Sequence, residues 1–312
     1  MVVSVDLIGD AVAATRAGDV RWARGRFAGP WGLRFQATGG ITFHLVMQGS
    51  AWLLPPDGSP PLRLLAGDVV LVARGRPHGL ADDPRTPLAD VVPGQQAYWT
   101  RDADIPPGVT PTVVLGGSYW LHHVRPHPLI ASLPPVIHFP ARAGALTAVR
   151  SVVDLLAAEM DAGRVGATAA IPALLDLLLI YGVRAWYEQA DLATGWAAAL
   201  RDPGLSRAIS LMQQHPERPW TVQGLAEQAG MSRAVFARRF ASLIGQTPLA
   251  YLTWWRMTRA AALLRETAQP VAAVAARAGY ESEFAFSRAF RREFGTAPGA
   301  YRRHHAREDP GA

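Results

Sequence analysis

The sequence predicts a multidomain α+β protein: an antiparallel β-barrel or sandwich, then a helical hairpin, then an all-α region. Three observations support this class. The chain has 312 residues, which is too long for one compact core. Short apolar runs between turns give way to helical spacing after about residue 142. An internal repeat occupies the last third. We expect domains at residues 1–142, 143–202 and 203–312.

Composition excludes several kinds of chemistry. The chain has no cysteine, so disulfides, thiolate metal sites and cysteine nucleophiles are ruled out. No basic stretch precedes an apolar run at the N-terminus, so we expect no signal peptide and a cytoplasmic protein. The longest apolar run, residues 167–183, is interrupted by Pro172 and Asp176 and is shorter than the roughly 20 residues of a membrane helix. No membrane partner is expected.

Charge is distributed unevenly along the chain. Residues 1–202 contain 16 arginines and 17 acidic residues, whereas residues 203–312 contain 15 arginines and 8 acidic residues, a net charge of +7. A basic region joined to a nearly neutral one is typical of a protein that binds a polyanion through one end. The C-terminal region is therefore the candidate for nucleic-acid binding.

The N-terminal region, from about Ala23 to His138, has the pattern of a β domain. Apolar runs of strand length, such as GITFHLVMQG and DVVLVARG, alternate with turn clusters such as PPDGSPP and DDPRTP. Many short strands between closely spaced turns favour an antiparallel barrel or sandwich.

The middle region predicts two helices joined by a turn. ALTAVRSVVDLLAAEM and TAAIPALLDLLLIYGVRAWYEQ place apolar residues three and four positions apart, on either side of DAGRVGA. These helices carry more apolar surface than a small hairpin buries alone. Two interpretations stay open: the surplus packs between domains, or it forms a dimer interface.

The C-terminal region contains two copies of one helical unit. LAEQAGMSRAVFARRFASLIGQTPLAY matches VAARAGYESEFAFSRAFRREFGTAPGAY. Corresponding Ala and Gly residues lie 49 apart, and the Phe, Gly, Pro and Tyr residues that follow lie 50 apart. The matched pairs are Ala226 and Ala275, Gly230 and Gly279, Phe240 and Phe290, Gly245 and Gly295, Pro248 and Pro298, and Tyr251 and Tyr301.

Each copy has the features of a helix-turn-helix. A small alanine allows two helices to approach, a glycine permits the turn, and Ser232 or Ser282 is placed to cap the second helix. Phe236 and Phe240, like Phe286 and Phe290, lie at i and i+4 and predict a buried face. The second helix of each copy is the candidate recognition helix.

The outward positions of these helices are the candidate DNA contacts. They are Arg233, Ala234, Ala237 and Arg238 in the first copy, and Glu283, Phe284, Ser287 and Arg288 in the second. Arginine can pair with guanine, and alanine or phenylalanine can meet a thymine methyl group, so we expect Arg238 and Arg288 to read bases. Flanking arginines suit phosphate contacts. These are Arg239, Arg291, Arg292, Arg302 and Arg303.

A connecting helix separates the two copies. Thr247 as cap and Pro248 at the first position predict a helix of about 20 residues and about 30 Å. That length is comparable to the roughly 34 Å between successive major grooves on one face of a duplex. We expect its apolar residues to form the core that fixes the spacing: Leu249, Leu252, Trp255, Leu263 and Leu264.

Together these residues resemble the DNA-binding domain of the AraC/XylS family of bacterial transcription regulators, over about residues 205–303. The second copy, with its closing FGTAPGAYRR, carries most of the resemblance. It places Ser232, Ala234, Ala237 and Arg238 on the first recognition helix, and Ser282, Glu283, Ser287 and Arg288 on the second. Phe284 stands where a small polar residue is more usual. The resemblance implies promoter DNA as a partner and activation through RNA polymerase.

The N-terminal region is similar to the cupin-type sensor domain of one branch of this family. FHLVMQGSAWLLPPDG and LRLLAGDVVLVARGRPHGLADD carry the match. A cupin metal site uses two His two residues apart, a Glu and a later His. Here His44 and His78 fit two positions, residue 46 is Val and the Glu is missing, so no metal or other cofactor is expected.

The resemblance implies a small-molecule effector inside this domain. The candidate contact residues are His44, Trp52, His78, Trp99, Trp120 and His122. The leading interpretation is an effector-responsive homodimeric transcription regulator, and no enzymatic activity is expected. Two alternatives stay open: a metal-dependent cupin enzyme fused to a DNA-binding domain, and a regulator that binds DNA as a dimer without any ligand.

Overall fold

The computed structural model describes residue 9 and residues 20–38, 40–91, 105–119, 128–141, 147–162, 165–189 and 195–308. The chain divides into two compact units. One, the β unit, comprises residues 16–122 and 130–189, and the other, the helical unit, comprises residues 1–15, 123–129 and 190–312. The expected middle domain, residues 143–202, is thus divided between the two units. Trp99, Trp120 and His122 lie outside the described residues.

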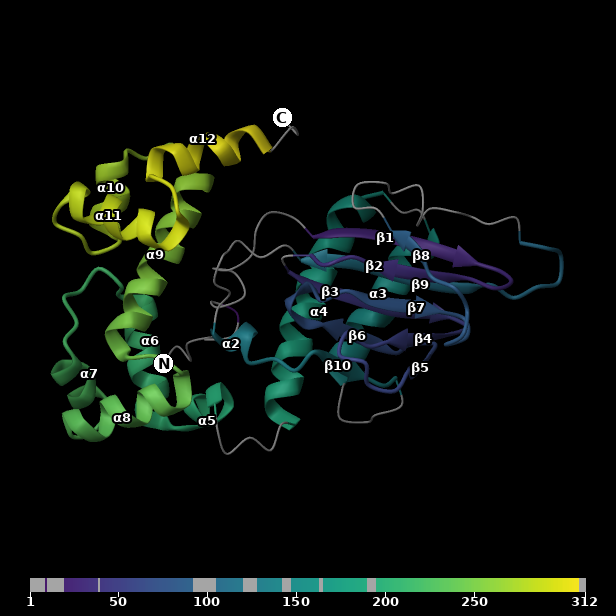
Figure 1. The fold of residues 1–312 in the computed structure, drawn as a ribbon, viewed down its shortest axis with the longest axis horizontal. Coiled ribbons are helices and arrows are strands. Elements are labelled where there is room, and N and C mark those ends of the chain that lie inside the picture. The colour runs from purple at the N-terminus through teal and green to yellow at the C-terminus, as the bar shows by residue number, and fades with distance from the viewer. Residues whose placement is uncertain are drawn as a thin grey trace. The chain divides into compact units, whose positions relative to one another are not determined.

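Two five-stranded sheets form the β unit (Figure 1). The first sheet has the order β1 (Arg21–Phe27), β9 (Thr112–Tyr119), β3 (Ile41–Gln48), β6 (Val69–Val72) and β10 (Val136–Phe139). The second has the order β5 (Leu62–Leu65), β4 (Ser50–Leu54), β7 (His78–Ala81), β2 (Gly32–Phe35) and β8 (Ala89–Val91). The predicted antiparallel β fold is confirmed, except that β2 and β8 pair in parallel.

The inward faces of the two sheets meet in one apolar core. Val46, Val70 and Leu53 belong to it and are fully buried. Because side chains alternate along a strand, the neighbours of Val46 point out of the other face of β3. On that face Phe43 packs against Tyr119, with ring centroids 5.3 Å apart.

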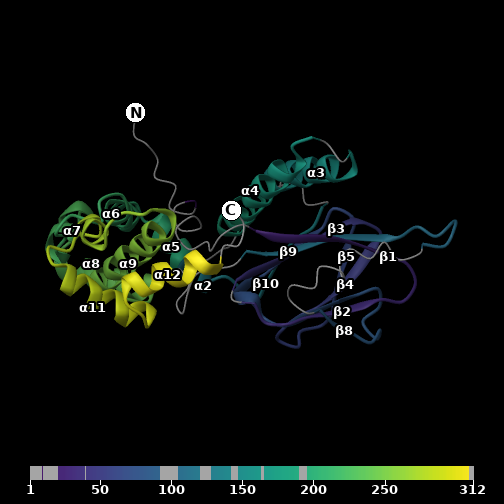
Figure 2. The same cartoon turned by 90° about the horizontal axis from the view of Figure 1, so that it is seen from above.

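Two helices cover the outer face of the first sheet. They are α3 (Thr147–Ala162) and α4 (Ala167–Gln189), and Figure 2 shows them over the sheet that contains β3 and β9. Gly182 of α4 lies so close that an added Cβ would be 3.2 Å from side-chain atoms of Leu71 and Phe139. The Tyr119 hydroxyl donates to the Leu175 carbonyl. The two predicted helices therefore form a layer of the β unit. The short helix α2 (Pro128–Ala131) and a 3₁₀ turn at Ala73–Gly75 complete its connections.

By length and composition, α4 could also span a membrane, since its most apolar 18-residue window has a mean hydropathy of 1.5. A long core helix of a folded domain has the same properties. Of this window, 33% is buried, and α4 contacts the sheet at Gly182 and Leu175.

The helical unit consists of eight described helices (Figure 1). They are α5 (Gly195–Arg201), α6 (Pro203–Gln214), α7 (Val222–Gln228), α8 (Arg233–Ile244), α9 (Pro248–Glu266), α10 (Val271–Arg277), α11 (Glu283–Phe294) and α12 (Pro298–Glu308). Thr247 caps α9 and Pro248 is its first residue, as predicted. α9 has 19 residues and therefore spans about 28 Å. Its apolar face is buried as expected at Leu252, Trp255 and Leu264, but Leu249 is 41% exposed. That expectation was wrong because Leu249 lies two positions before the buried Tyr251 and so points to nearly the opposite side of α9.

Candidate nucleic-acid interface

The first predicted helix-turn-helix is formed by α7 and α8. Ala226 is fully buried where the helices approach, and Gly230 has a φ of +67° in the turn. The Ser232 hydroxyl accepts a hydrogen bond from the Val235 N–H and so caps α8. Gly245, with a φ of +79°, ends α8 in the left-handed conformation that glycine adopts readily.

The second copy, α10 and α11, repeats this construction. Ala275 is 1% exposed, Gly279 has a φ of +75°, and the Ser282 hydroxyl caps α11 through the Ala285 N–H. Gly295 ends α11 with a φ of +73°. The sequence repeat therefore corresponds to two copies of one three-dimensional motif.

Each recognition helix buries one face and exposes the opposite one. In both copies the paired phenylalanine rings are fully buried, with centroids 5.6 Å apart. Since a helix has 3.6 residues per turn, the residues two before and two after the first Phe lie on the opposite side. We call the exposed residues there the outward rows. They are Ala234, Arg238 and Ser242 on α8, and Phe284, Arg288 and Arg292 on α11.

The other predicted contacts lie around these rows. Arg233 and Glu283 are exposed in the first turns of their helices, whereas Ala237 and Ser287 are only half-exposed. Ser242 was missed from the sequence because a serine that is not a cap gives no signal. Ser242 lies one turn after Arg238 on the same face of α8, and this spacing identifies it as a member of the row.

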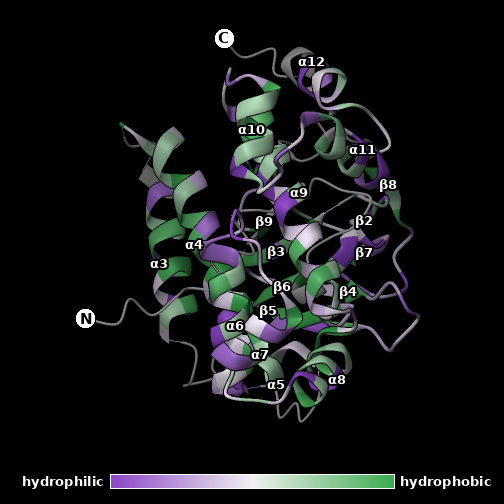
Figure 3. Cartoon of the chain, turned by 90° about the vertical axis from the view of Figure 1, so that its left-hand side faces the viewer, coloured by the Kyte–Doolittle hydropathy of each residue, from purple (hydrophilic) through white to green (hydrophobic). Residues whose placement is uncertain are grey.

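The two recognition helices lie on a common side of α9. Figures 1 and 3 show α8 and α11 at opposite ends of α9 and displaced to the same side. The two recognition helices are thus held on one side of a single connecting helix.

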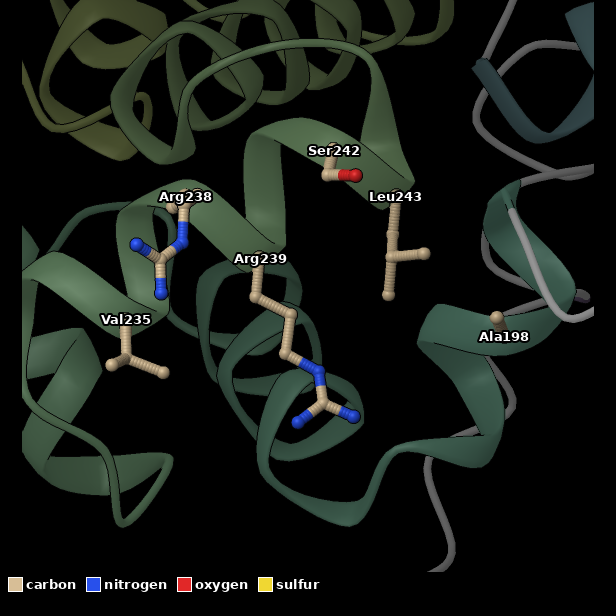
Figure 4. A pocket seen from close by; sticks show the side chains of 6 residues that line it. All are labelled: Ala198, Val235, Arg238, Arg239, Ser242 and Leu243. Carbon is tan, nitrogen blue, oxygen red and sulfur yellow. The ribbon is translucent and has the colours of Figure 1, made fainter.

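A groove of about 530 Å³ lies between α8 and α5. Figure 4 shows Arg239 pointing into the space between these helices, with Leu243 and Ala198 facing each other across it. Arg238, Val235 and Ser242 complete the lining. The groove therefore borders the outward row of α8 and extends the exposed surface toward α5.

Arg239 is held by an ion pair inside the helical unit. Its Nη2 lies 2.7 Å from Oδ2 of Asp202, whose side chain is 7% exposed. The other carboxylate oxygen of Asp202 accepts hydrogen bonds from Gly204 and Leu205 and caps α6. The Arg239 side chain remains 54% exposed, so it retains accessible donors, but its position is fixed.

Arg302 has a structural role. Its guanidinium donates to the carbonyl oxygens of Leu264, at 3.1 Å, and Gln269, at 2.5 Å, near the end of α9. The expectation that Arg302 contacts phosphates is therefore not supported by its position. Arg291, Arg292 and Arg303 are exposed.

The candidate effector residues of the β unit separate into two groups. His44 and His78 are 0% and 5% exposed, and their Nε2 atoms lie 2.7 Å apart. His44 lies two residues before Val46 and therefore faces the core between the sheets. Trp52 alternates with the core residues Ala51 and Leu53, so it lies on the other face of β4 and does not line this core.

Burial keeps both histidines neutral. Desolvation holds the pKa of His44 well below its usual range, and the repulsion between His44 and His78 in their charged forms lowers this pKa further. Desolvation lowers the pKa of His78 to about 4, opposed by a hydrogen bond to the Arg76 carbonyl. With both rings neutral, one Nε2 donates this hydrogen bond and the other accepts it.

The residues do not fit a cupin-type metal site. In the described part of the chain, no three His, Asp or Glu side chains gather closely enough to hold a metal ion. Two nitrogen ligands of one tetrahedral zinc would lie about 3.3 Å apart. The histidine nitrogens are closer, at 2.7 Å, and hydrogen-bond each other.

The fold and the exposed surface define a class of protein: a regulator that binds DNA through two helix-turn-helix motifs and carries a separate β domain. Residues 6–188 match the cupin family, and residues 225–304 match a family described as a helix-turn-helix domain. The chain belongs to the AraC-like transcription regulators with an N-terminal cupin domain. The family resemblance seen in the sequence is thus confirmed.

Several relatives support this assignment. A putative AraC-like transcription regulator of Streptomyces lividans is 34% identical over 88% of this chain and 91% of its own length. The HTH-type transcriptional regulator AlkR of Acinetobacter baylyi is 32% identical, again over 88% of this chain and 91% of its own. Among solved structures, the DNA-binding domain of AdpA in complex with a target DNA is 36% identical, with a TM-score of 0.34, and covers 36% of this chain and 99% of the AdpA domain.

Proposed function

We propose that this protein is a cytoplasmic, sequence-specific regulator that binds promoter DNA as a homodimer, responds to a small-molecule effector in the β unit and activates transcription through RNA polymerase. One observation carries the proposal: α8 and α11 lie on a common side of α9, and each exposes a row of side chains opposite its buried phenylalanines. Such rows fit two successive turns of the major groove.

Within this proposal, the contacts divide by chemistry. Arg238 and Arg288 lie at the centres of the rows, where a guanidinium can pair with guanine O6 and N7. Arg233, Arg239 and Arg292 lie near the flanks and bind phosphates, and the net charge of +7 in residues 203–312 supplies the long-range attraction. Four smaller or apolar side chains face the major groove of the DNA: Ala234, Ala237, Phe284 and Ser287. Ser282 and Glu283 lie at the start of α11.

The experiment that tests base reading replaces Arg238 by alanine in the full-length protein. We expect discrimination at one base pair of the operator to fall by about 1 to 3 kcal/mol, while binding to unrelated DNA changes little. Binding would be measured at fixed salt on the operator, on all substitutions of the contacted base pair, and on random DNA. An equal loss on every DNA would contradict the assigned role.

The effector site is placed at His44 and His78, because they are polar groups that face the apolar core between the sheets. Full-length His44→Ala is expected to bind DNA but lose the change in affinity that the effector causes. Genome-wide mapping of the protein's DNA sites would suggest effectors to test through the neighbouring genes. A variant that still responds normally would exclude His44, and a wild type without any ligand-induced melting shift would favour the ligand-independent alternative.

Dimerisation is assigned to α3 and α4. Leu155 and Leu177 are 53% and 39% exposed on these helices, although Leu156 and Leu178 are buried against the β unit. Leu155→Glu is expected to shift the full-length protein toward the monomer in analytical ultracentrifugation. Replacing the exposed Ser151 of the same helix by Glu is the control for added charge.

A further inference from the structure

The second recognition helix carries an exposed aromatic ring that the fold does not use. Phe284, the second residue of α11, is 73% exposed. Of the large apolar side chains in the described part of the chain, only Val165 is more exposed. Phe284 is not part of the apolar cluster that includes Phe286 and Phe290. A single exposed apolar residue is common on protein surfaces, but this one lies in the outward row of a recognition helix, next to the central arginine of that row.

Phe284 also contacts the central arginine of its row. The guanidinium carbon of Arg288, one turn later, lies 5.9 Å from the centroid of the Phe284 ring. Arginine stacks on aromatic rings through its flat face, which leaves the N–H groups at its edge available. The ring therefore restricts the guanidinium without using its donors.

The first copy provides an internal comparison. Fifty residues earlier, Ala234 and Arg238 occupy the positions of Phe284 and Arg288, opposite an equally buried phenylalanine pair. Ala234 has no ring on which Arg238 could stack. The two copies thus present the same arginine with and without an aromatic neighbour.

We propose that Phe284 and Arg288 act as one reading unit for two adjacent base pairs, a guanine bound by Arg288 and a neighbouring thymine whose methyl group contacts Phe284. The inference rests on the proposed function, because it needs α11 in the major groove. Thymine is distinguished there by its C5 methyl group, and an aromatic ring is a suitable apolar partner for it. The ring lies one helical turn from the arginine, within reach of the adjacent base pair. Phe284 is therefore a specificity-determining residue, and the first copy, whose Ala234 offers a much smaller apolar surface, is expected to show a weaker preference for thymine at the equivalent position.

The test begins with in vitro selection from random double-stranded DNA, using the full-length wild type, Phe284→Ala and Ala234→Phe. The wild type is expected to select thymine beside the guanine more strongly in the DNA segment bound by α11 than in the segment bound by α8. Phe284→Ala is expected to weaken both the thymine and the guanine preference in the α11 segment, whereas Ala234→Phe is expected to strengthen the thymine preference in the α8 segment. Because Phe284 is exposed, Phe284→Ala is expected to have the same melting temperature as the wild type.

The second step removes only the methyl group. Deoxyuridine replaces the selected thymine, and affinity is measured for wild type and for Phe284→Ala. We expect a loss of about three- to tenfold for wild type and a clearly smaller loss for the variant. An equal loss for both proteins would overturn the inference while leaving sequence-specific binding intact. If the wild type selected no sequence at all, the proposed function itself would fail.

Discussion

Two glycines at equivalent places in the repeat meet different surroundings. Gly230 and Gly279 both have positive φ in the turn of a helix-turn-helix. A Cβ on Gly230 would have no heavy atom within 4 Å, whereas a Cβ on Gly279 would lie 2.9 Å from the Glu217 carbonyl oxygen. The first glycine is required for its backbone conformation alone, and the second also for a close approach.

We therefore expect Gly279→Ala to destabilise the protein more than Gly230→Ala. A left-handed alanine costs about 1 to 2 kcal/mol, which both variants share, and overpacking adds about 1 to 3 kcal/mol at Gly279 alone. Urea unfolding of both variants, followed by tryptophan fluorescence, measures the difference. Equal free energies of unfolding would show that the neighbours of Gly279 move aside at no cost.

The buried histidine pair predicts that acid destabilises the β unit. The pKa of His78 falls from 6.5 to about 4 on folding, and that of His44 also falls. The unfolded chain therefore binds more protons between these values, and stability decreases as the pH falls from about 6.5 toward 4. At about 1.4 kcal/mol per pKa unit, His78 alone accounts for a loss of about 3 kcal/mol across this range.

The measurement is the melting temperature of the full-length protein between pH 7.5 and pH 4. His44→Asn/His78→Asn is expected to be less stable at pH 7 but to change less on acidification. The control is Val70→Ala, because Val70 is the cross-strand partner of His44 and its truncation removes core volume without removing a titratable group. The melting temperature of this variant should lie below that of the wild type by the same amount at every pH. Parallel curves for wild type and the double variant would contradict the prediction.

At the scale of elements, polar side chains form hydrogen bonds at both ends of α9, the helix that connects the two motifs. Thr247 caps the start of α9, and Arg302 of α12 binds two carbonyl oxygens near its end. Tyr301 accepts a hydrogen bond from Arg265 of α9. The closing helix α12 is therefore attached to the connector by polar contacts as well as by apolar packing.

Arg302→Ala is expected to lower the free energy of unfolding by about 1 to 3 kcal/mol, because two partly buried carbonyl oxygens lose a charged donor. The neighbouring Arg303→Ala is the matched control, since Arg303 is exposed and its removal should change stability by less than about 0.5 kcal/mol. Thermal unfolding of both variants compares them directly. Equal losses would place Arg302 at the surface, as the sequence suggested.

At the scale of the helical unit, one arginine joins the two halves. Arg256, in the middle of α9, donates to the carbonyl oxygens of Pro216 and Arg218, before the first motif. Its guanidinium also lies 5.9 Å from the ring of Tyr280, in the turn of the second motif. Arg256 thus links the segment before the first motif to the turn of the second motif.

Arg256→Lys is expected to weaken binding to an operator that contains both half-sites more than binding to either half-site alone. Lysine keeps the charge, but it cannot bind two carbonyl oxygens and stack on a ring at the same time. The exposed Arg259 of α9, changed to Lys, is the control. A uniform loss on whole and half operators would indicate lost stability instead of lost alignment.

Much of the helical unit follows from the sequence. The repeat, the turn glycines, the serine and threonine caps and the buried phenylalanines were all predicted, because each depends on residues within one turn or one motif. The β fold and the helical pair of residues 147–189 were predicted for the same reason. Alternation and helical spacing are local properties that short segments express directly.

Tertiary structure alone decided which side chains meet across the chain. It pairs Arg239 with Asp202, uses Arg302 inside the fold, places Trp52 away from the core and brings His44 to His78, 34 residues away. It also lays α3 and α4 on a sheet of the β unit, where the sequence left two roles open. These contacts depend on strand register and on helix docking. Both are set by the packing of segments far apart in sequence, which no local pattern encodes.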